Sequence, residues 1–200
     1  MKYFLFFILL YSTLYGKKDF YYSFIDNKKT QIEQSKKNKI IQGNAKLKKI
    51  DQLVKDGRID DALEQITQFR LNNNIDILRS TVELLYSEIL YKSGTKKNMT
   101  EGAKVLEAAI NQSVISEGDL LEANVLLVKL FVNINKIKEA KYYAESIKNI
   151  FKDQLSLAYG KISEAYIDTQ AKRYKKSIAT LYDILLKTND LKVATVVADE

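Results

Sequence analysis

The sequence has no histidine, no cysteine, no tryptophan and no proline among its 200 residues. Histidine and cysteine supply the commonest general base, the commonest metal ligands and the thiol nucleophile. Their absence lowers the expectation of catalysis, although an enzyme built on carboxylates or lysines stays open. Zero proline is typical of a nearly all-helical chain, because proline breaks helix interiors. Without cysteine, no disulfide pattern indicates the compartment.

Positive charge is concentrated near the N-terminus. The whole chain has a formal net charge of +7. Residues 17–50 contain ten lysines against three acidic residues, whereas residues 51–200 contain 21 basic and 22 acidic residues. The longer part of the chain is close to neutral, so nucleic-acid binding would have to rest on the N-terminal lysines alone. We expect neither nucleic acid nor a small-molecule substrate as a partner.

Residues 1–16 have the organisation of a secretory signal peptide. Lys2 precedes an apolar run from Tyr3 to Tyr11, which is shorter than the roughly 20 residues that span a bilayer. Gly16 is a small residue before a polar stretch, and we expect cleavage after it. An uncleaved signal anchor is the alternative. Both interpretations predict an exported bacterial protein, either periplasmic or associated with the cell envelope.

Residues 17–43 form a basic and aromatic lead-in segment. Phe20–Ile25 holds four aromatic side chains, and lysines follow between Lys28 and Lys39. Such a composition favours contact with an anionic membrane surface. The plainer interpretation is a linker and lead-in helix, whose aromatic side chains pack on the helices that follow.

Four sets of small and apolar residues recur through residues 44–188. Within each set the offsets are 0, 3, 7 and 10, and the sets begin 40, 38 and 37 residues apart. The offsets place one stripe on a helix, and the near-constant spacing is typical of stacked helical hairpins. The second member of every set is small, which permits close approach of another helix. The sets are Ile59, Ala62, Ile66, Phe69; Met99, Gly102, Leu106, Ala109; Ile137, Ala140, Ala144, Ile147; and Tyr174, Ser177, Leu181, Ile184.

The pattern predicts an all-α domain over residues 44–200, built from about four stacked antiparallel helical hairpins and a terminal helix. Gly57 should end the first helix, because a left-handed C-cap favours glycine. The Asn72–Asn74 run should end the second. The terminal helix either caps the stack or belongs to a longer array. Seven of the nine expected helices cover residues 44–56, 59–71, 100–110, 117–134, 137–151, 155–169 and 174–186. The third helix in chain order has the apolar residues Leu78, Val82, Leu85 and Ile89, and the ninth has Val193, Val196 and Val197.

The block from Leu127 to Ala140 resembles the tetratricopeptide repeat. In this resemblance Phe131 takes the aromatic position of the first helix, Ile137 opens the second helix, and Ala140 is the small residue where paired helices touch. The resemblance covers residues 44–188. The family's first-helix tryptophan and glycine and its closing proline are absent, and these spacings exceed its usual length of about 34. The chain is therefore similar to a degenerate array, and other α-solenoid hairpins stay open.

The resemblance implies a scaffold that binds another protein along the concave face formed by the first helix of each repeat. It implies partner-binding positions at Asp51 and Lys55 in the first repeat, and at Lys129 and Asn133 in the third. Ordinary solvated surface is the alternative for all four. No cofactor, metal or catalytic residue is expected. Exported arrays of this kind resemble envelope assembly factors, cell-division accessories and periplasmic flagellar-motor scaffolds.

Two other classes of function stay open. One is an envelope protein anchored by an uncleaved N-terminal segment, with the helical repeats as its interaction domain. The other is an enzyme, for which Glu164 and Asp168 are the candidates because they lie four residues apart on one expected helix face. No base, nucleophile or glycine-rich loop accompanies them, so a solvated acidic face explains them better. The pair Asp60 and Asp61 is explained by the dipole at a helix N-terminus.

Overall fold

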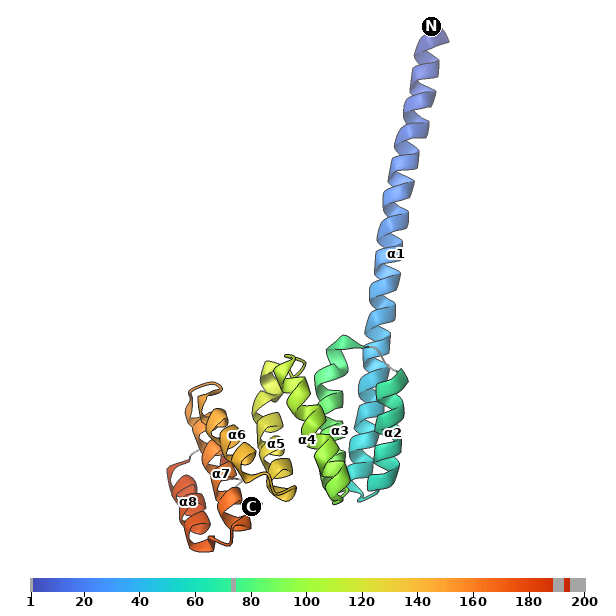
Figure 1. Ribbon diagram of the computed structural model, residues 1–200. Helices are drawn as coiled ribbons and strands as arrows, with labels where there is room; N and C mark the ends of the chain where they lie inside the picture. The colour runs from blue at the N-terminus through green and yellow to red at the C-terminus, as the bar shows by residue number, and fades with distance from the viewer. Residues whose placement is uncertain (1, 73–74, 189–192, 195–200) are drawn as a thin grey trace. The chain divides into compact units, whose positions relative to one another are not determined.

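The computed structural model describes residues 2–72, 75–188 and 193–194, with side chains from residue 28 onward (Figure 1). All the secondary structure in these residues is helical. The chain divides into two units, Met1–Lys46 and Leu47–Glu200. The helices are α1 (Lys2–Lys55), α2 (Ile59–Asn72), α3 (Arg79–Lys92), α4 (Lys96–Asn111), α5 (Leu120–Asn133), α6 (Ile137–Asn149), α7 (Gln154–Gln170) and α8 (Tyr174–Lys187), with 3-10 turns η1 (Asp76–Leu78) and η2 (Glu117–Asp119).

Most of α1 lies in the first unit. The prediction that the first helix starts at Asn44 is wrong, because α1 begins at Lys2. No proline interrupts residues 2–55, and a glycine inside a helix costs only about 1 kcal/mol, which is too little to end it. Between residues 28 and 46 every position is exposed except the half-buried Ile40 and the buried Gly43. This stretch is a solvated basic helix.

The predictions for the N-terminal residues fall largely outside the described side chains. These begin at residue 28, after the predicted signal sequence, its cleavage point at Gly16 and the aromatic run Phe20–Ile25. The packing of those aromatic residues on later helices stays a prediction. Among the described residues, we find no helix with both the length and the hydropathy to cross a membrane.

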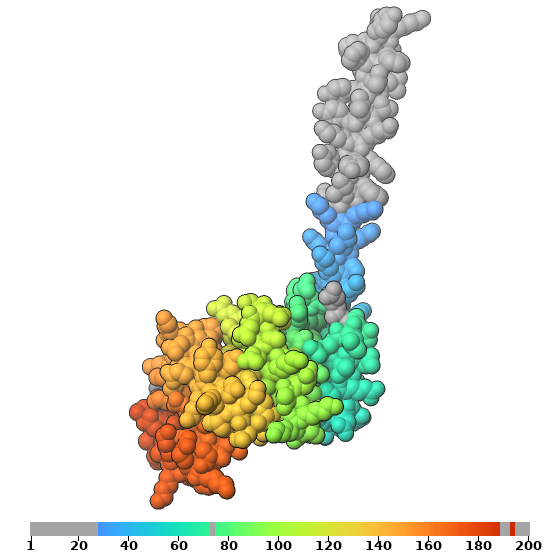
Figure 2. All heavy atoms as spheres, in the orientation of Figure 1, coloured from blue at the N-terminus to red at the C-terminus, as the bar shows by residue number. Residues whose placement is uncertain are grey.

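In the second unit each helix packs against the next one in the chain. Contacts join α2 to α3 and continue in sequence to α7 and α8, and short connections make the neighbours antiparallel (Figure 1). Figure 2 shows neighbouring helices in close contact on the face in view. The end of α1 enters this unit with the buried side chains Leu47, Ile50 and Val54. The predicted all-α fold of stacked helical hairpins is confirmed.

Three hairpin turns share one backbone motif. In each turn, the residue two positions before the first member of the stripe has a left-handed backbone conformation. Its φ is 75° at Gly57, 66° at Asn135 and 61° at Lys172. The next N–H then donates to a carbonyl five residues earlier, as in a Schellman turn. These bonds are Arg58 N to Leu53 O at 2.9 Å, Lys136 N to Phe131 O at 2.8 Å and Arg173 N to Asp168 O at 2.8 Å. Gly57 is confirmed as a helix end, and two equivalent turns form without glycine.

The turn between α3 and α4 is different. We expected the fourth helix to start at Thr100, and this is wrong, because α4 starts at Lys96. Thr95 is extended, and its side chain accepts the backbone N–H of Asn98 at 3.2 Å. This N-cap starts the helix one turn earlier. The other predicted helices lie within three residues of the observed bounds, while Asn73, Asn74, Val196 and Val197 lie outside the described residues.

The second and fourth positions of the repeated stripe are buried in all four hairpins, whereas the first position is half-buried in three hairpins and exposed at Tyr174 in the fourth. A Cβ at Gly102 would lie 3.2 Å from Leu90 Cβ and 3.3 Å from the Ser87 carbonyl oxygen, both on α3. Ser177 Oγ lies 2.7 Å from Thr169 Oγ1 on α7. In these two hairpins the small residue therefore faces the first helix of its own pair, as predicted. The four small positions, all buried, are Ala62, Gly102, Ala140 and Ser177.

The buried side chains are unevenly distributed along the stack. A large apolar cluster extends from α3 to α7 and is centred on α5, where Leu127, Val128 and Leu130 are fully buried. The predicted burial of α5 on more than one face is confirmed. A smaller cluster joins α7 and α8 through Ile162, Ile184 and Val193. The core is therefore deepest in the middle of the described helices.

Candidate functional site

The first helices of successive hairpins, α3, α5 and α7, come together on one side of the stack. α5 contacts α7 directly and α3 over fewer residues, whereas no two even-numbered helices show comparable backbone contact in the described part. The first helices of the hairpins form one layer of the stack and the second helices form the other. The layer whose helices lie closer together is on the inside of the curve. We call the side chains that α3, α5, α7 and the end of α1 present there the inner surface.

A polar cluster ties these three helices together, and we call Tyr91, Lys129, Asn133 and Tyr166 the tyrosine cluster. The hydroxyl oxygens of Tyr91 on α3 and Tyr166 on α7 lie 3.3 Å apart. Asn133 on α5 donates from Nδ2 to the Tyr166 hydroxyl at 2.8 Å. Lys129 Nζ lies 5.5 Å from the centre of the Tyr166 ring, at cation–π distance. The cluster therefore joins residues 75 positions apart in the chain.

The end of α1 contributes an exposed ion pair to the inner surface. Lys55 Nζ lies 2.7 Å from Asp51 Oδ2. The hydrogen bond with Asp51 raises the pKa of Lys55, the Asp51 charge adds to this, and the more distant charge of Glu88 on α3 contributes in the same direction. Exposed pairs of this kind add little to stability. On a binding surface, such an ion pair holds its two charges in a fixed arrangement.

Glu122 on α5 lies within electrostatic reach of the acidic residues Glu88 and Asp119. Its side chain is exposed to solvent. Nevertheless, desolvation by its surroundings raises the pKa of Glu122, and the like charges of Glu88 and Asp119 raise it further.

The structure brings the four predicted partner-binding residues together in two pairs. Asp51 contacts Lys55, and Asn133 Nδ2 donates to the Lys129 carbonyl oxygen at 2.8 Å. The first pair lies on α1 and the second on α5. Sequence reasoning missed Tyr91, Tyr166, Glu88 and Glu122. Both tyrosines lie on the first helix of a hairpin, but no local pattern indicates that side chains of α3 and α7 meet.

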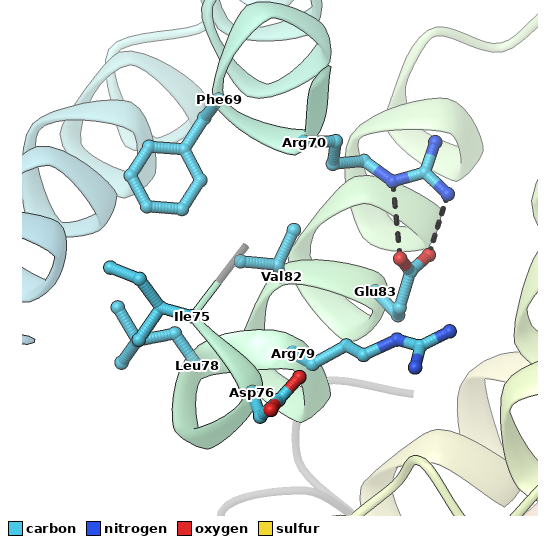
Figure 3. Close-up of a pocket in the computed structure, with 8 residues that line it drawn as sticks. All are labelled: Phe69, Arg70, Ile75, Asp76, Leu78, Arg79, Val82 and Glu83. Atoms are coloured by element: carbon cyan, nitrogen blue, oxygen red, sulfur yellow. Dashed lines mark hydrogen bonds and ion pairs between the residues drawn. The ribbon is translucent and has the colours of Figure 1, made fainter. Parts of the chain in front are cut away.

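A cleft of about 330 Å³ lies where α2, η1 and α3 meet (Figure 3). Phe69, Leu78 and Val82 form its apolar wall. On the other side Arg70 binds Glu83 through two hydrogen bonds, of 2.7 and 3.3 Å. The Arg70 guanidinium also lies 4.0 Å from the centre of the Tyr86 ring. The ion pair therefore joins α2 of the first hairpin to α3 of the second.

The two carboxylates considered for catalysis are held by cations. Glu164 accepts a 2.7 Å hydrogen bond from Lys148. Asp168 is nearly buried and accepts bonds from Arg173 and Lys176. Burial by itself raises the pKa of Asp168, but the bonds from these two cations hold it below its ordinary value. Within the described residues, no group of three or more acidic, histidine or cysteine side chains is placed to hold a metal ion.

Comparison with known proteins finds no matching family model, no similar curated protein and no similar solved structure. The class of protein therefore rests on the fold and the inner surface: an all-α protein of sequentially stacked helical hairpins.

Proposed function

We propose that this chain is an exported, periplasmic scaffold that binds another protein along its inner surface in an envelope-associated assembly. The observation that carries the proposal is the tyrosine cluster, which brings tyrosine, lysine and asparagine side chains from α3, α5 and α7 together on one surface. Tyrosine suits such a surface because it offers a large rigid contact area together with a polar hydroxyl.

The repeats are proposed to be similar to tetratricopeptide repeats. Three features support this: the small residue buried between paired helices, the shared Schellman turn, and the closer packing of the first helices. In that arrangement Lys129 and Asn133 lie on the proposed binding surface, and Asp51 and Lys55 extend it toward the first hairpin. The partner is a protein segment that lies across several hairpins.

The polar character of this surface predicts a partner segment with both apolar and hydrogen-bonding side chains. Lys129 offers a donor and Asn133 an acceptor at Oδ1, because both hydrogens of Asn133 Nδ2 already donate within the protein. Glu122 offers an acceptor in a partly desolvated setting. A flat apolar contact would leave these groups unpaired, which costs about 1–3 kcal/mol for each buried group. Specificity would therefore come from pairing these polar groups.

Site-specific photo-crosslinking tests the proposal. Because the chain has no cysteine, Asn133→Cys gives one attachment point for a benzophenone on the inner surface. Tyr142→Cys on α6, where the side chain is 67% exposed, is the matched control. Crosslinking in the native cells should give one dominant protein adduct from position 133 and none from position 142. Equal adducts from both positions, or none from either, would contradict the proposal.

A second candidate is a membrane-anchored envelope protein, with the same helices as its interaction domain. The apolar run Tyr3–Tyr11 favours it. Residues 17–43 would then add a basic contact with anionic lipid headgroups. N-terminal sequencing of the native protein separates the candidates, since a chain that starts at Lys17 has lost the anchor.

A further inference from the structure

The exposed part of α1 carries its positive charge on one side. Between residues 28 and 39 the helix has five lysines and one acidic residue, Glu33, and every position there is exposed. At 3.6 residues per turn, successive residues lie about 100° apart around the helix. Four of the five lysines therefore fall within an arc of about 100°, with Ile32 near its middle. We call this set the lysine face: Lys28, Lys29, Ile32, Lys36 and Lys39.

The opposite side of the same stretch is polar but uncharged. An arc of about 140° there has only amide and hydroxyl side chains. Between the two arcs, Glu33 and Lys37 lie four residues apart and have opposite charges. Solubility alone does not require this segregation, because like charges such as those of Lys36 and Lys39, three residues apart, destabilise a helix. The segregation indicates a partner that contacts one side of the helix. The uncharged arc is Thr30, Gln31, Gln34, Ser35 and Asn38.

The composition of this stretch indicates which anionic partner it fits. Residues 17–50 have ten lysines and no arginine, although arginine is the residue preferred for the planar, two-bond contacts of nucleic-acid recognition. Residues 28–39 also have no aromatic side chain on which a base could stack. Lysines on flexible stems suit a surface whose negative charges are spread out and mobile, as in a layer of anionic lipid.

Ile32 favours lipid over other polyanions. Its side chain is 55% exposed and lies among the lysines. An apolar side chain within a basic face gains little from phosphates alone, but it can enter the headgroup boundary of a bilayer. The lysine stems can lie along the same boundary while their ammonium groups stay in water. The lysine face therefore has both components of an interfacial helix.

We infer that the lysine face binds the phosphate headgroups of an anionic phospholipid surface, with this part of α1 lying in the plane of the membrane. The uncharged arc then faces water. Every member of the lysine face follows Gly16, so the contact is kept whether or not residues 1–16 are removed. The inference extends the headgroup contact of the second candidate to the exported scaffold itself. It needs neither an anchor nor a protein partner.

Co-sedimentation of the full chain with lipid vesicles tests the inference. The affinity for mixed phosphatidylglycerol and phosphatidylcholine vesicles is compared with that for phosphatidylcholine alone. The apolar run Tyr3–Tyr11 contributes to both affinities, so their ratio isolates the contribution of charge. At low salt the ratio should be at least about 100, since each lysine near such a surface contributes about fivefold, and it should fall as salt is added. Replacing all four lysines of the face by glutamine should remove most of it.

The neighbours Lys36 and Lys37 give a matched pair of variants, because only Lys36 belongs to the lysine face. Lys36→Gln and Lys37→Gln change the net charge equally and both positions are exposed, so the thermal midpoint should stay unchanged in each. Lys36→Gln should lower the affinity for the mixed vesicles about fivefold, and Lys37→Gln less than about twofold.

Three results would overturn the inference. Equal affinity for mixed and neutral vesicles would show that the lysines do not contact headgroups. Equal losses from Lys36→Gln and Lys37→Gln would show that only net charge counts. Tighter binding of duplex DNA than of the mixed vesicles at the same salt would show that the face serves a nucleic acid. Each of these leaves the crosslinking at position 133 unaffected, so this inference and the proposed scaffold function fail separately.

Discussion

Replacing Gly102 by alanine tests the packing of the second hairpin, because two effects of known size oppose each other. In an unobstructed helix interior, glycine to alanine stabilises by about 1 kcal/mol. Here the new carbon would lie 3.2 Å from Leu90 Cβ and 3.3 Å from the Ser87 carbonyl oxygen. Both atoms are fixed to the backbone of α3, so the two helices must separate. The third neighbour, Leu130 Cδ2 at 3.4 Å, is the end of a side chain and moves more easily.

Overpacking of a tight contact costs about 1–3 kcal/mol. Set against the propensity gain of about 1 kcal/mol, this gives a net loss of about 0–2 kcal/mol for Gly102→Ala. For a chain of this size, each kcal/mol moves the thermal midpoint by about 2–4 °C. Gly102→Leu adds more carbon at the same contact and should lose more stability than alanine.

Thermal and urea unfolding followed by far-UV circular dichroism suit this chain, which has no tryptophan. Gly118→Ala is the matched control, because an added Cβ at that position meets no atom within 4 Å. Its stability should change by less than about 0.5 kcal/mol. If Gly102→Ala raised the free energy of unfolding by the full helix-propensity gain, and Gly102→Leu left it unchanged, the assignment of this face to the helix contact would be refuted.

Four further measurements test other parts of the molecule. Ala140→Leu, at a fully buried helix contact, should cost about 1–3 kcal/mol, and an unchanged thermal midpoint would contradict the assigned register. Lys172→Gly should stabilise by about 1 kcal/mol in urea unfolding, because Lys172 is left-handed with φ of 61°. Tyr166→Phe should cost about 0.5–1.5 kcal/mol by removing the hydroxyl that Asn133 binds, whereas no change would show that the bond does not hold the inner layer. Asp168→Asn should lower the free energy of unfolding by about 1–3 kcal/mol near neutral pH. The folded pKa of Asp168 lies below the ordinary 3.8, so the stability that its carboxylate contributes is complete above pH 3.8 and disappears as the pH falls through the folded pKa. The unfolding curves of the wild-type and Asp168→Asn proteins should therefore converge in acid.

The pairing of helices could be predicted because its signals are local. The recurrence of a small residue at Ala62, Gly102, Ala140 and Ser177 identified the contact face, and the structure buries all four. Gly57 marked a turn because its φ of 75° is one that glycine adopts without strain. Each of these depends on residues within one hairpin.

The features that sequence reasoning missed depend on competing local signals or on contacts between residues far apart in the chain. The start of α4 was predicted at Thr100 because the Thr95 side chain, which accepts the backbone N–H of Asn98, was not recognised as a helix cap. The length of α1 was missed because helix-forming residues before Asn44 give no stop signal. The tyrosine cluster joins Tyr91 to Tyr166 and depends on how far each hairpin is rotated against the last, which no local pattern encodes.

The uneven depth of the core sets the order in which the stack comes apart. Neighbour-only packing makes the stability of such an array approximately a sum of local terms, so its parts open separately. The small cluster of Ile162, Ile184 and Val193 holds α8 less firmly than the central cluster holds α5. We therefore expect α8 to open while α5 keeps its partners, so in hydrogen–deuterium exchange the backbone amides of α8 should lose protection before those of α5.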